Sequence, residues 1–176
     1  MPELPEITVY TERVQALGQT LLAIRLASPF ILRTVDPAPE TFPGHALETV
    51  NRTGKRIVLA FEGELYAVIH LMISGRLHWR ATGAALPRRV GILAFDFPTG
   101  TLLLTEASAK HRASLHLVSG SAGLSAFERG GVDLLQSTLE ALGAPLRRQS
   151  RTLKRALTDP TIVDGVGNAS PCSPTG

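Results

Sequence analysis

The sequence predicts an α+β protein: an N-terminal helix plus an eight-stranded antiparallel β-sandwich, followed by a shorter helical segment and an irregular tail. Three observations predict this class. Apolar residues recur at helical spacing near the N-terminus, short β-rich runs separated by turn residues occupy positions 21–118, and helical patterns return after position 134. Short connections without intervening helices imply that the strands pair in antiparallel fashion.

The first helix is expected over residues 5–17. Pro5 suits a first-turn position, Gly18 suits the position after the last turn, and the apolar residues between them would face the core. Such a helix holds the beginning of the chain at its N-terminus, where backbone N–H groups favour phosphates and other anions. The apolar residues that carry this pattern are Ile7, Tyr10, Val14 and Leu17.

The expected strands are short runs that alternate or are rich in β-branched and aromatic residues. Turn residues such as Thr53-Gly54 and Pro98-Thr99-Gly100 separate many of them. About eight strands of this kind form a sandwich or a flattened barrel. The runs are 21–26, 47–51, 57–61, 66–71, 76–79, 91–97, 102–105 and 114–118.

The remainder of the chain has a different pattern. Residues 120–123 are expected to form a linker, two helices are expected over 134–142 and 152–158, and a glycine-rich turn follows at 165–168. The last eight residues carry two prolines, two serines and the only cysteine, and cannot continue a helix or fill a core. The expected division is 1–120 for the sandwich with its helix, 121–168 for the helical segment and 169–176 for the tail.

Composition and charge describe an ordinary globular protein with a basic bias. Hydrophobic residues make up 44% of the chain and charged residues 19%, and the net charge is +3. The run from Arg147 to Arg155 holds five cations and no acid, which fits either a solvated face or a strip that binds phosphates. Both interpretations stay open for this run taken alone.

A single cysteine, Cys172, excludes a disulfide framework within the chain and a zinc site built from several cysteines. We therefore expect no metal site and no cofactor in this chain. Acidic residues stand where a signal peptide would have a basic region, and no apolar run approaches the roughly 18 residues of a membrane span. We expect a cytoplasmic protein with no membrane partner.

The first candidate site is the cluster Pro2, Glu3 and Glu6. Removal of Met1 would leave Pro2 as a free secondary amine, which can attack the C1′ carbon of a sugar and form an iminium. Glu3 lies close enough to protonate a sugar oxygen as a general acid. The alternatives are that Pro2 is only a permissive second residue, and that the two acids only complement the dipole of the first helical turn.

The second and third candidate sites are basic. Lys55 and Arg56 lie at the tip of an expected hairpin, where they could meet a phosphate or a flipped nucleotide. The turn at 165–168 offers backbone N–H groups to a phosphate, and Lys154 precedes it. A polar hairpin tip is also common in any soluble β protein, so neither motif is decisive alone.

Two histidines are weaker candidates. His70 lies in an apolar run and is more simply explained as a core histidine than as a metal ligand. His111 lies in a polar stretch between strands that could either reach a DNA groove or form an ordinary loop.

Taken together, these motifs resemble the formamidopyrimidine-DNA glycosylases, also called the Fpg/Nei family. The motifs are MPELPE at 1–6, the Lys55 hairpin, IHLMISGRL at 69–77 and GVGN at 165–168. The resemblance implies a monomeric DNA-repair enzyme of the bacterial nucleoid, a DNA glycosylase and AP lyase. It would remove 8-oxoguanine and formamidopyrimidines from double-stranded DNA, act on abasic sites, and cleave the strand by β- and then δ-elimination.

The resemblance also implies a role for each matching residue. Pro2 would be the nucleophile, Glu3 the proton donor, and Glu6 an acid near the active site. Lys55 would contact the phosphate beside the lesion, and Asn168 would contact a phosphate from a helix–two-turn–helix motif.

The sequence departs from the family pattern in two loops. Ile73 stands at the position of a methionine that fills the void left by the flipped base, and an apolar isoleucine could still intercalate. Lys110, His111 and Arg112 occupy the loop where members carry an arginine–phenylalanine pair. These residues are nevertheless expected to contact DNA, together with Arg56 and Lys154.

The resemblance stops after Asn168. Family members continue into further helices and a zinc finger with four cysteines, so we expect a chain truncated by a frameshift or a premature stop, without the structural zinc of the family. The alternative functions are a weak or inactive DNA-binding remnant and a sandwich protein unrelated to DNA.

Overall fold

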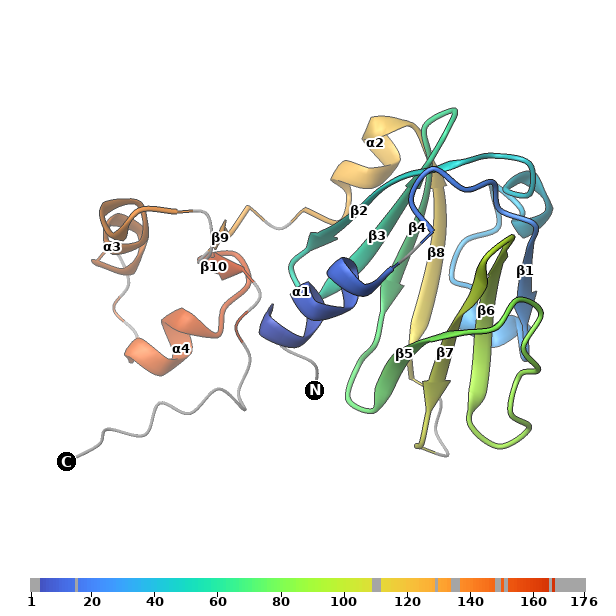
Figure 1. Cartoon of the computed structure of the whole chain (residues 1–176). Helices are drawn as coiled ribbons and strands as arrows, with labels where there is room; N and C mark the ends of the chain where they lie inside the picture. Colours follow the sequence, from blue (N-terminus) through green and yellow to red (C-terminus); the bar gives the residue numbers. More distant parts are fainter. Residues whose placement is uncertain are drawn as a thin grey trace.

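The protein is a β-sandwich joined to a small helical module (Figure 1). The structure, a computed structural model, describes residues 4–14, 16–108, 112–128, 130–133, 137–147, 150, 152–164 and 166. Two four-stranded antiparallel sheets have the orders β1-β6-β7-β5 and β2-β3-β4-β8, which confirms the predicted eight-stranded sandwich. The strands are β1 Ala23–Leu26, β2 Leu47–Thr53, β3 Arg56–Phe61, β4 Leu65–His70, β5 Gly75–Arg80, β6 Gly91–Phe97, β7 Gly100–Glu106 and β8 Ser114–Ser119.

Helix α1 (Leu4–Arg13) packs beside β2 and β3 and buries Ile7 completely. It ends four residues before the predicted boundary. The reason is that Gly18 donates its N–H to the carbonyl of Leu47 at 2.7 Å, and Leu47 donates to the carbonyl of Gln19 at 2.9 Å. This pairing with β2 draws the chain out of the helix and leaves Leu17 exposed.

The main core lies between the two sheets. Phe42 and Phe61 meet edge to face with ring centroids 5.6 Å apart, and Trp79 stacks on Phe97 at 6.1 Å. Every residue of β6 is buried, because the segment between β5 and β6 crosses the outer face of its sheet (Figure 1). Strand β6 is therefore covered on both faces.

An ion pair fastens that covering segment. Arg25 donates to both carboxylate oxygens of Asp96 at 2.6 and 2.8 Å and to the carbonyl of Ala84 at 2.7 Å. Thr101 donates to Asp96 at 2.6 Å and accepts from the N–H of Gly83 at 2.9 Å. Burial raises the pKa of Asp96, but the hydrogen bonds from Arg25 and Thr101 and the charge of Arg25 outweigh it, and the pKa lies below its ordinary value.

The chain beyond β8 forms α2 (Gly120–Ser125), β9 (Val132–Asp133), α3 (Leu139–Arg147), α4 (Leu153–Leu157) and β10 (Val163–Asp164). Ala156, Ile162 and Val163 form its small core, against which Leu142, Leu146, Leu157 and Val166 pack. β9 and β10 pair in parallel, a contact between segments far apart in sequence. Within the described residues, no helix has the length and apolar character that a membrane span requires.

Two predictions for this module need correction. Residues 120–123 begin α2 instead of forming a linker; Gly120 adopts φ +74, which turns the chain directly from β8 into the helix. The helix predicted to stop at 142 continues through Pro145 to Arg147, although glycine and proline usually end helices. Residues 134–136 lie outside the described part of the chain. The helix predicted over 152–158 is confirmed as α4, with Thr152 and Thr158 as its caps.

Candidate functional site

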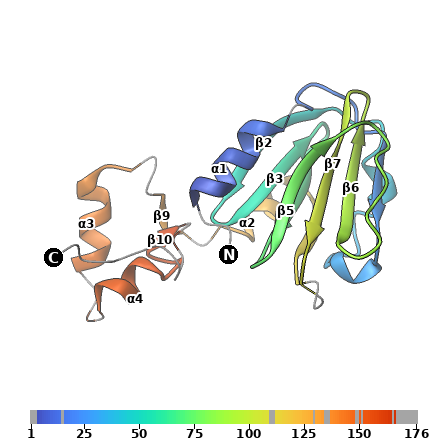
Figure 2. The ribbon, with the colours of Figure 1, turned by 60° about the horizontal axis from the view of Figure 1, so that its bottom comes forward.

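The beginning of α1 lies on the side of the sandwich that faces β9 and β10, as both views show (Figures 1 and 2). Pro2 and Glu3 lie outside the described residues. Glu6 belongs to α1 by its backbone, and its side chain also lies outside the described part. The catalytic roles of all three residues stay predictions. The structure describes the elements that surround the beginning of α1.

One of these elements is the hairpin formed by β2 and β3, the two strands beside which α1 packs. Gly54 adopts φ +58 in the two-residue turn, and Lys55 beside it is half-buried. A Cβ atom at Gly54 would lie 2.5 Å from Oδ1 of Asp164, so the tip packs directly against the end of β10. Only glycine fits this contact in this backbone conformation.

A second contact joins the same hairpin to the helical module. Nη2 of Arg52 donates to both carboxylate oxygens of Asp133 in β9, at 2.7 and 2.6 Å. The Arg52 side chain is only 12% exposed, so water screens this ion pair weakly. The hairpin is therefore held by β9 and β10 together.

The guanidinium of Arg56, next to the hairpin tip, packs on an aromatic ring. It lies over the ring of Phe127 at 5.5 Å, and the same ring meets His116 edge to face at 4.9 Å. Burial, followed by the charges of Arg56 and Arg33, lowers the pKa of His116. Arg56 thus has a structural contact in this fold, and its contact with DNA stays a prediction.

The glycine-rich turn begins immediately after β10. Gly165, Gly167 and Asn168 lie outside the described residues, while Val166 packs on the small core of the helical module. Because Gly54 touches Asp164, the last residue before this turn lies next to the Lys55 hairpin. Lys154 lies exposed on α4. The fold therefore brings the end of β10 to a hairpin about 110 residues earlier in the sequence.

A second group of predicted residues lies at the end of the sandwich where β4 turns into β5. Ile73 is 57% exposed in that turn, after Met72 at φ +54. Arg112 is exposed in the connection from β7 to β8, and Lys110 and His111 lie outside the described residues. Ile73 therefore projects an apolar side chain into solvent, as a wedge would require.

Sequence reasoning missed the residue that links these two loops. Glu106, at the end of β7, is 1% exposed. It accepts hydrogen bonds from Oγ of Ser74 at 3.3 Å and from the N–H of Ala113 at 3.0 Å. The only available signal was a carboxylate at the end of a strand that otherwise carries no charge.

His70 lies between the strand that follows the Lys55 hairpin and the strand that follows the Arg112 loop. It ends β4, opposite Arg56 on one side and Ser114 on the other, and it is half-buried. The core-histidine interpretation is therefore only partly right. The strand position explains why: His70 is the last residue of β4, where the sandwich opens to solvent.

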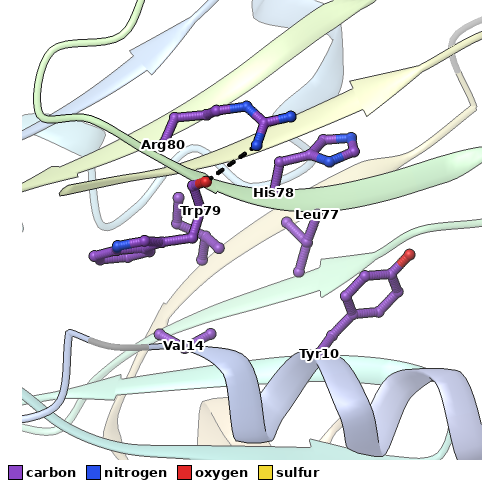
Figure 3. Close-up of a pocket in the computed structure, with 7 residues that line it drawn as sticks. Tyr10, Val14, Leu77, His78, Trp79 and Arg80 are labelled. Carbon is purple, nitrogen blue, oxygen red and sulfur yellow. Dashed lines mark hydrogen bonds between the residues drawn. The ribbon is translucent and has the colours of Figure 1, made fainter.

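A cavity of about 420 Å³ lies between α1 and β5 (Figure 3). Tyr10 and Val14 face Leu77 and Trp79 across it, while His78 projects to the other face of β5 and binds Thr105 at 3.0 Å. Burial, with the charges of Arg80 and Arg76, lowers the pKa of His78. Tyr10 lies six residues into α1, roughly 9 Å along its axis from Leu4, so this cavity is separate from the candidate catalytic end.

Residues 1–116 match the family model of the formamidopyrimidine-DNA glycosylase N-terminal domain. The chain belongs to the formamidopyrimidine-DNA glycosylase family. Its relatives include the formamidopyrimidine-DNA glycosylases of Streptococcus pyogenes and Pelotomaculum thermopropionicum, each 29% identical over 96% of this chain. This chain spans 62% and 63% of the lengths of these two proteins.

Solved structures of this family share the fold. MutM in complex with DNA containing carbocyclic 8-oxo-G superposes with a TM-score of 0.81 at 22% identity, over 95% of this chain and 64% of MutM. The Lactococcus lactis Fpg in complex with DNA containing an abasic site gives a TM-score of 0.81 at 21% identity, over 95% of this chain and 63% of that protein. The family resemblance of the sequence is confirmed.

The sequence holds one cysteine, so a zinc site built from several cysteines has no ligand set within it. The expectation of a chain without the structural zinc stays a prediction. Within the part of the chain that the structure describes, no three His, Cys, Asp or Glu side chains gather as metal ligands.

Proposed function

We propose that this protein is a base-excision repair DNA glycosylase with AP lyase activity, acting on oxidised purines in double-stranded DNA. The observation that carries the proposal is the meeting of three elements: the beginning of α1, the Lys55 hairpin and the end of β10. A helix N-terminus, a lysine and a glycine-rich turn together favour a phosphate beside the amine of Pro2.

The proposed chemistry uses residues of this chain alone. Once Met1 is removed, the secondary amine of Pro2 attacks C1′ and loses its proton, while the bond from C1′ to the damaged base breaks and the base leaves with a proton. Glu3 then gives a proton to the ring oxygen, the bond between C1′ and that oxygen breaks, and the iminium forms between Pro2 and C1′. Loss of a C2′ proton then expels the 3′ phosphate, and a second elimination expels the 5′ phosphate.

The other roles follow from position. Lys55 would hold the phosphate next to the lesion, with Asn168 as a second phosphate contact and Glu6 near the amine. Ile73 would fill the space that the flipped nucleotide leaves. DNA containing 8-oxo-G or an abasic site is bound by the related MutM and Lactococcus lactis proteins, which supports the same substrate class here. We expect a monomer in the bacterial cytoplasm.

Borohydride trapping tests the proposal. The purified chain is incubated with a duplex carrying 8-oxoguanine opposite cytosine, or an abasic site, and sodium borohydride. We expect a protein–DNA adduct on a denaturing gel that maps to the N-terminal residue and that Pro2→Gly strongly reduces, because a primary amine on a flexible glycine replaces the fixed secondary amine of proline. A Glu48→Gln change, at an exposed position of β2, is the matched control and should leave the adduct unchanged.

Mass spectrometry first establishes that Met1 has been removed. If a folded chain without Met1 forms no adduct on either duplex yet still binds DNA, the protein is a DNA-binding member of the family without lyase activity. If peptide mapping places the adduct on a residue other than the N-terminal one, the chemistry does not belong to Pro2 and the proposed mechanism is wrong.

A further inference from the structure

A groove of about 530 Å³ opens between the segment that follows β1 and the beginning of β6. Its volume lies within the range of small-molecule sites. Three side chains dominate its chemistry: Phe30, Arg33 and Arg88. Nothing in the proposed glycosylase mechanism uses them.

Backbone hydrogen bonds fasten the segment that presents Phe30 to solvent. Phe30 is 82% exposed, yet it lies in a short 3-10 helix, Pro29–Ile31, whose last residue is buried. Ser28 accepts from the N–H of Phe30 at 3.4 Å. The N–H of Arg33 donates to the carbonyl of Leu115 at 2.9 Å. An exposed aromatic ring on a fixed backbone loses little freedom when it binds a ligand.

The rest of the lining complements a nucleotide. Buried Ile31 and Ile92 give the groove an apolar base, and its described lining contains no acidic residue. Arg33 and Arg88 are both exposed, and neither guanidinium has a hydrogen-bond or ion-pair partner among the described residues. An aromatic platform beside two cations is the arrangement with which proteins bind unpaired nucleotides.

The position of the groove connects it to the wedge residue. Ala113 lines the groove and donates its N–H to Glu106, which accepts at its other oxygen from Ser74, the neighbour of Ile73. Gly91, also in the lining, pairs with Thr105 in β7, beside Glu106. The groove and Ile73 therefore lie at the same end of the sandwich, joined through one buried carboxylate.

We infer that this groove binds one unstacked nucleotide of a DNA strand. The base stacks on Phe30, and Arg33 and Arg88 hold the adjoining phosphates. The inference rests on the proposed function for the presence of DNA, because a duplex opened at Ile73 offers unstacked nucleotides at this end of the sandwich. The chemistry would also suit a free nucleotide, so the experiment includes one.

The experiment measures DNA affinity by fluorescence anisotropy with undamaged oligonucleotides. One labelled duplex carries a single unpaired nucleotide, a second is fully paired, and dGMP serves as a competitor. We expect Phe30→Ala to weaken binding of the first duplex by roughly 5- to 150-fold, the range that loss of base stacking produces, and that of the paired duplex much less. Phe30→Trp should restore the affinity, whereas Phe30→Leu should not.

The salt dependence of DNA affinity tests the two arginines of the groove. Arg33→Gln and Arg88→Gln should each reduce the slope of log affinity against log salt by about one. The matched controls are Arg89→Gln, an exposed neighbour outside the groove lining, and Val35→Ala, which removes an exposed apolar side chain from the same loop. Phe30, Arg33 and Arg88 are exposed, so thermal melting should show an unchanged fold in every variant.

The outcomes distinguish failure of the groove proposal from failure of the catalytic proposal. The groove proposal is wrong if Phe30→Ala and the parent chain bind the duplex with the unpaired nucleotide equally well. It is also wrong if Arg88→Gln and Arg89→Gln give equal salt slopes. Both conclusions hold even if the Pro2 adduct forms. A Phe30-dependent affinity without any Pro2 adduct supports the groove and rejects the glycosylase. Competition by dGMP at concentrations comparable to the oligonucleotide would assign the groove to free nucleotides instead. Self-association that Phe30→Ala abolishes would assign it to a second copy of the chain.

Discussion

At the scale of single residues, Glu106 shows how one buried carboxylate sets the geometry of a binding surface. Its two oxygens accept from two loops that would otherwise be independent, the turn that carries Ile73 and the connection that ends at Ala113. A buried acceptor shared by two donors favours a single arrangement of both loops. The shape of this end of the sandwich therefore depends on one side chain.

Glu106→Ala should lower the free energy of unfolding by about 2 kcal/mol, because it leaves the buried N–H of Ala113 without its acceptor. Urea denaturation measures the change. Glu106→Gln keeps one carbonyl acceptor and should cost less. Equal stability of the alanine variant and the parent would show that the two loops do not depend on this residue.

At the scale of elements, the β2–β3 hairpin joins the sandwich to the helical module. Its tip touches β10 through Gly54, and its strand β2 reaches β9 through the ion pair between Arg52 and Asp133. The candidate catalytic end of α1 lies over this junction. The position of the hairpin relative to β9 and β10 is thus a condition for any chemistry there.

A double-mutant cycle measures this junction. Arg52→Gln and Asp133→Asn should each destabilise the chain, and the double variant should recover about 1 kcal/mol relative to the sum, because both changes remove one shared contact. Arg80→Gln, on β5, combined with Asp133→Asn should be additive. Additive behaviour of the Arg52 pair as well would mean that this contact does not hold the module.

The same elements show what sequence reasoning could predict. All eight sandwich strands were predictable, because each run has a β-rich pattern and turn residues separate many of the runs. The parallel pair β9–β10 was not, since each strand has two residues and its partner lies about 30 residues away. The Lys55 hairpin and the 165–168 turn were found as motifs, but only the fold shows that the hairpin touches Asp164, the residue before that turn. Glu106 and Phe30 were missed because a buried acid and an exposed ring carry no periodic signal.

At the scale of the whole molecule, two half-buried histidines make the stability depend on pH. Burial, then the charges of Arg56 and Arg33, lowers the pKa of His116; burial, then Arg80 and Arg76, lowers that of His78. Both imidazoles are therefore protonated more readily in the unfolded chain than in the folded one. Their contribution is fully present above the ordinary histidine pKa of about 6.5 and is lost as the pH falls through the lower folded values.

The free energy of unfolding should accordingly fall between pH 7 and pH 5, and His116→Gln should flatten part of that fall. Urea denaturation of the parent and the variant at pH 5, 6, 7 and 8 provides the comparison. At pH 8 the histidines are neutral, so the difference in the free energy of unfolding between variant and parent reports the lost packing of His116 against Phe127. The charges that repel protonated His116 come from the sheet that carries the hairpin and from the segment that carries Phe30. A parent chain equally stable at pH 5 and pH 7 would mean that neither burial nor these arginines oppose protonation of the histidines in the folded state. A loss that His116→Gln leaves unchanged would assign the effect to His78 at the opposite sheet.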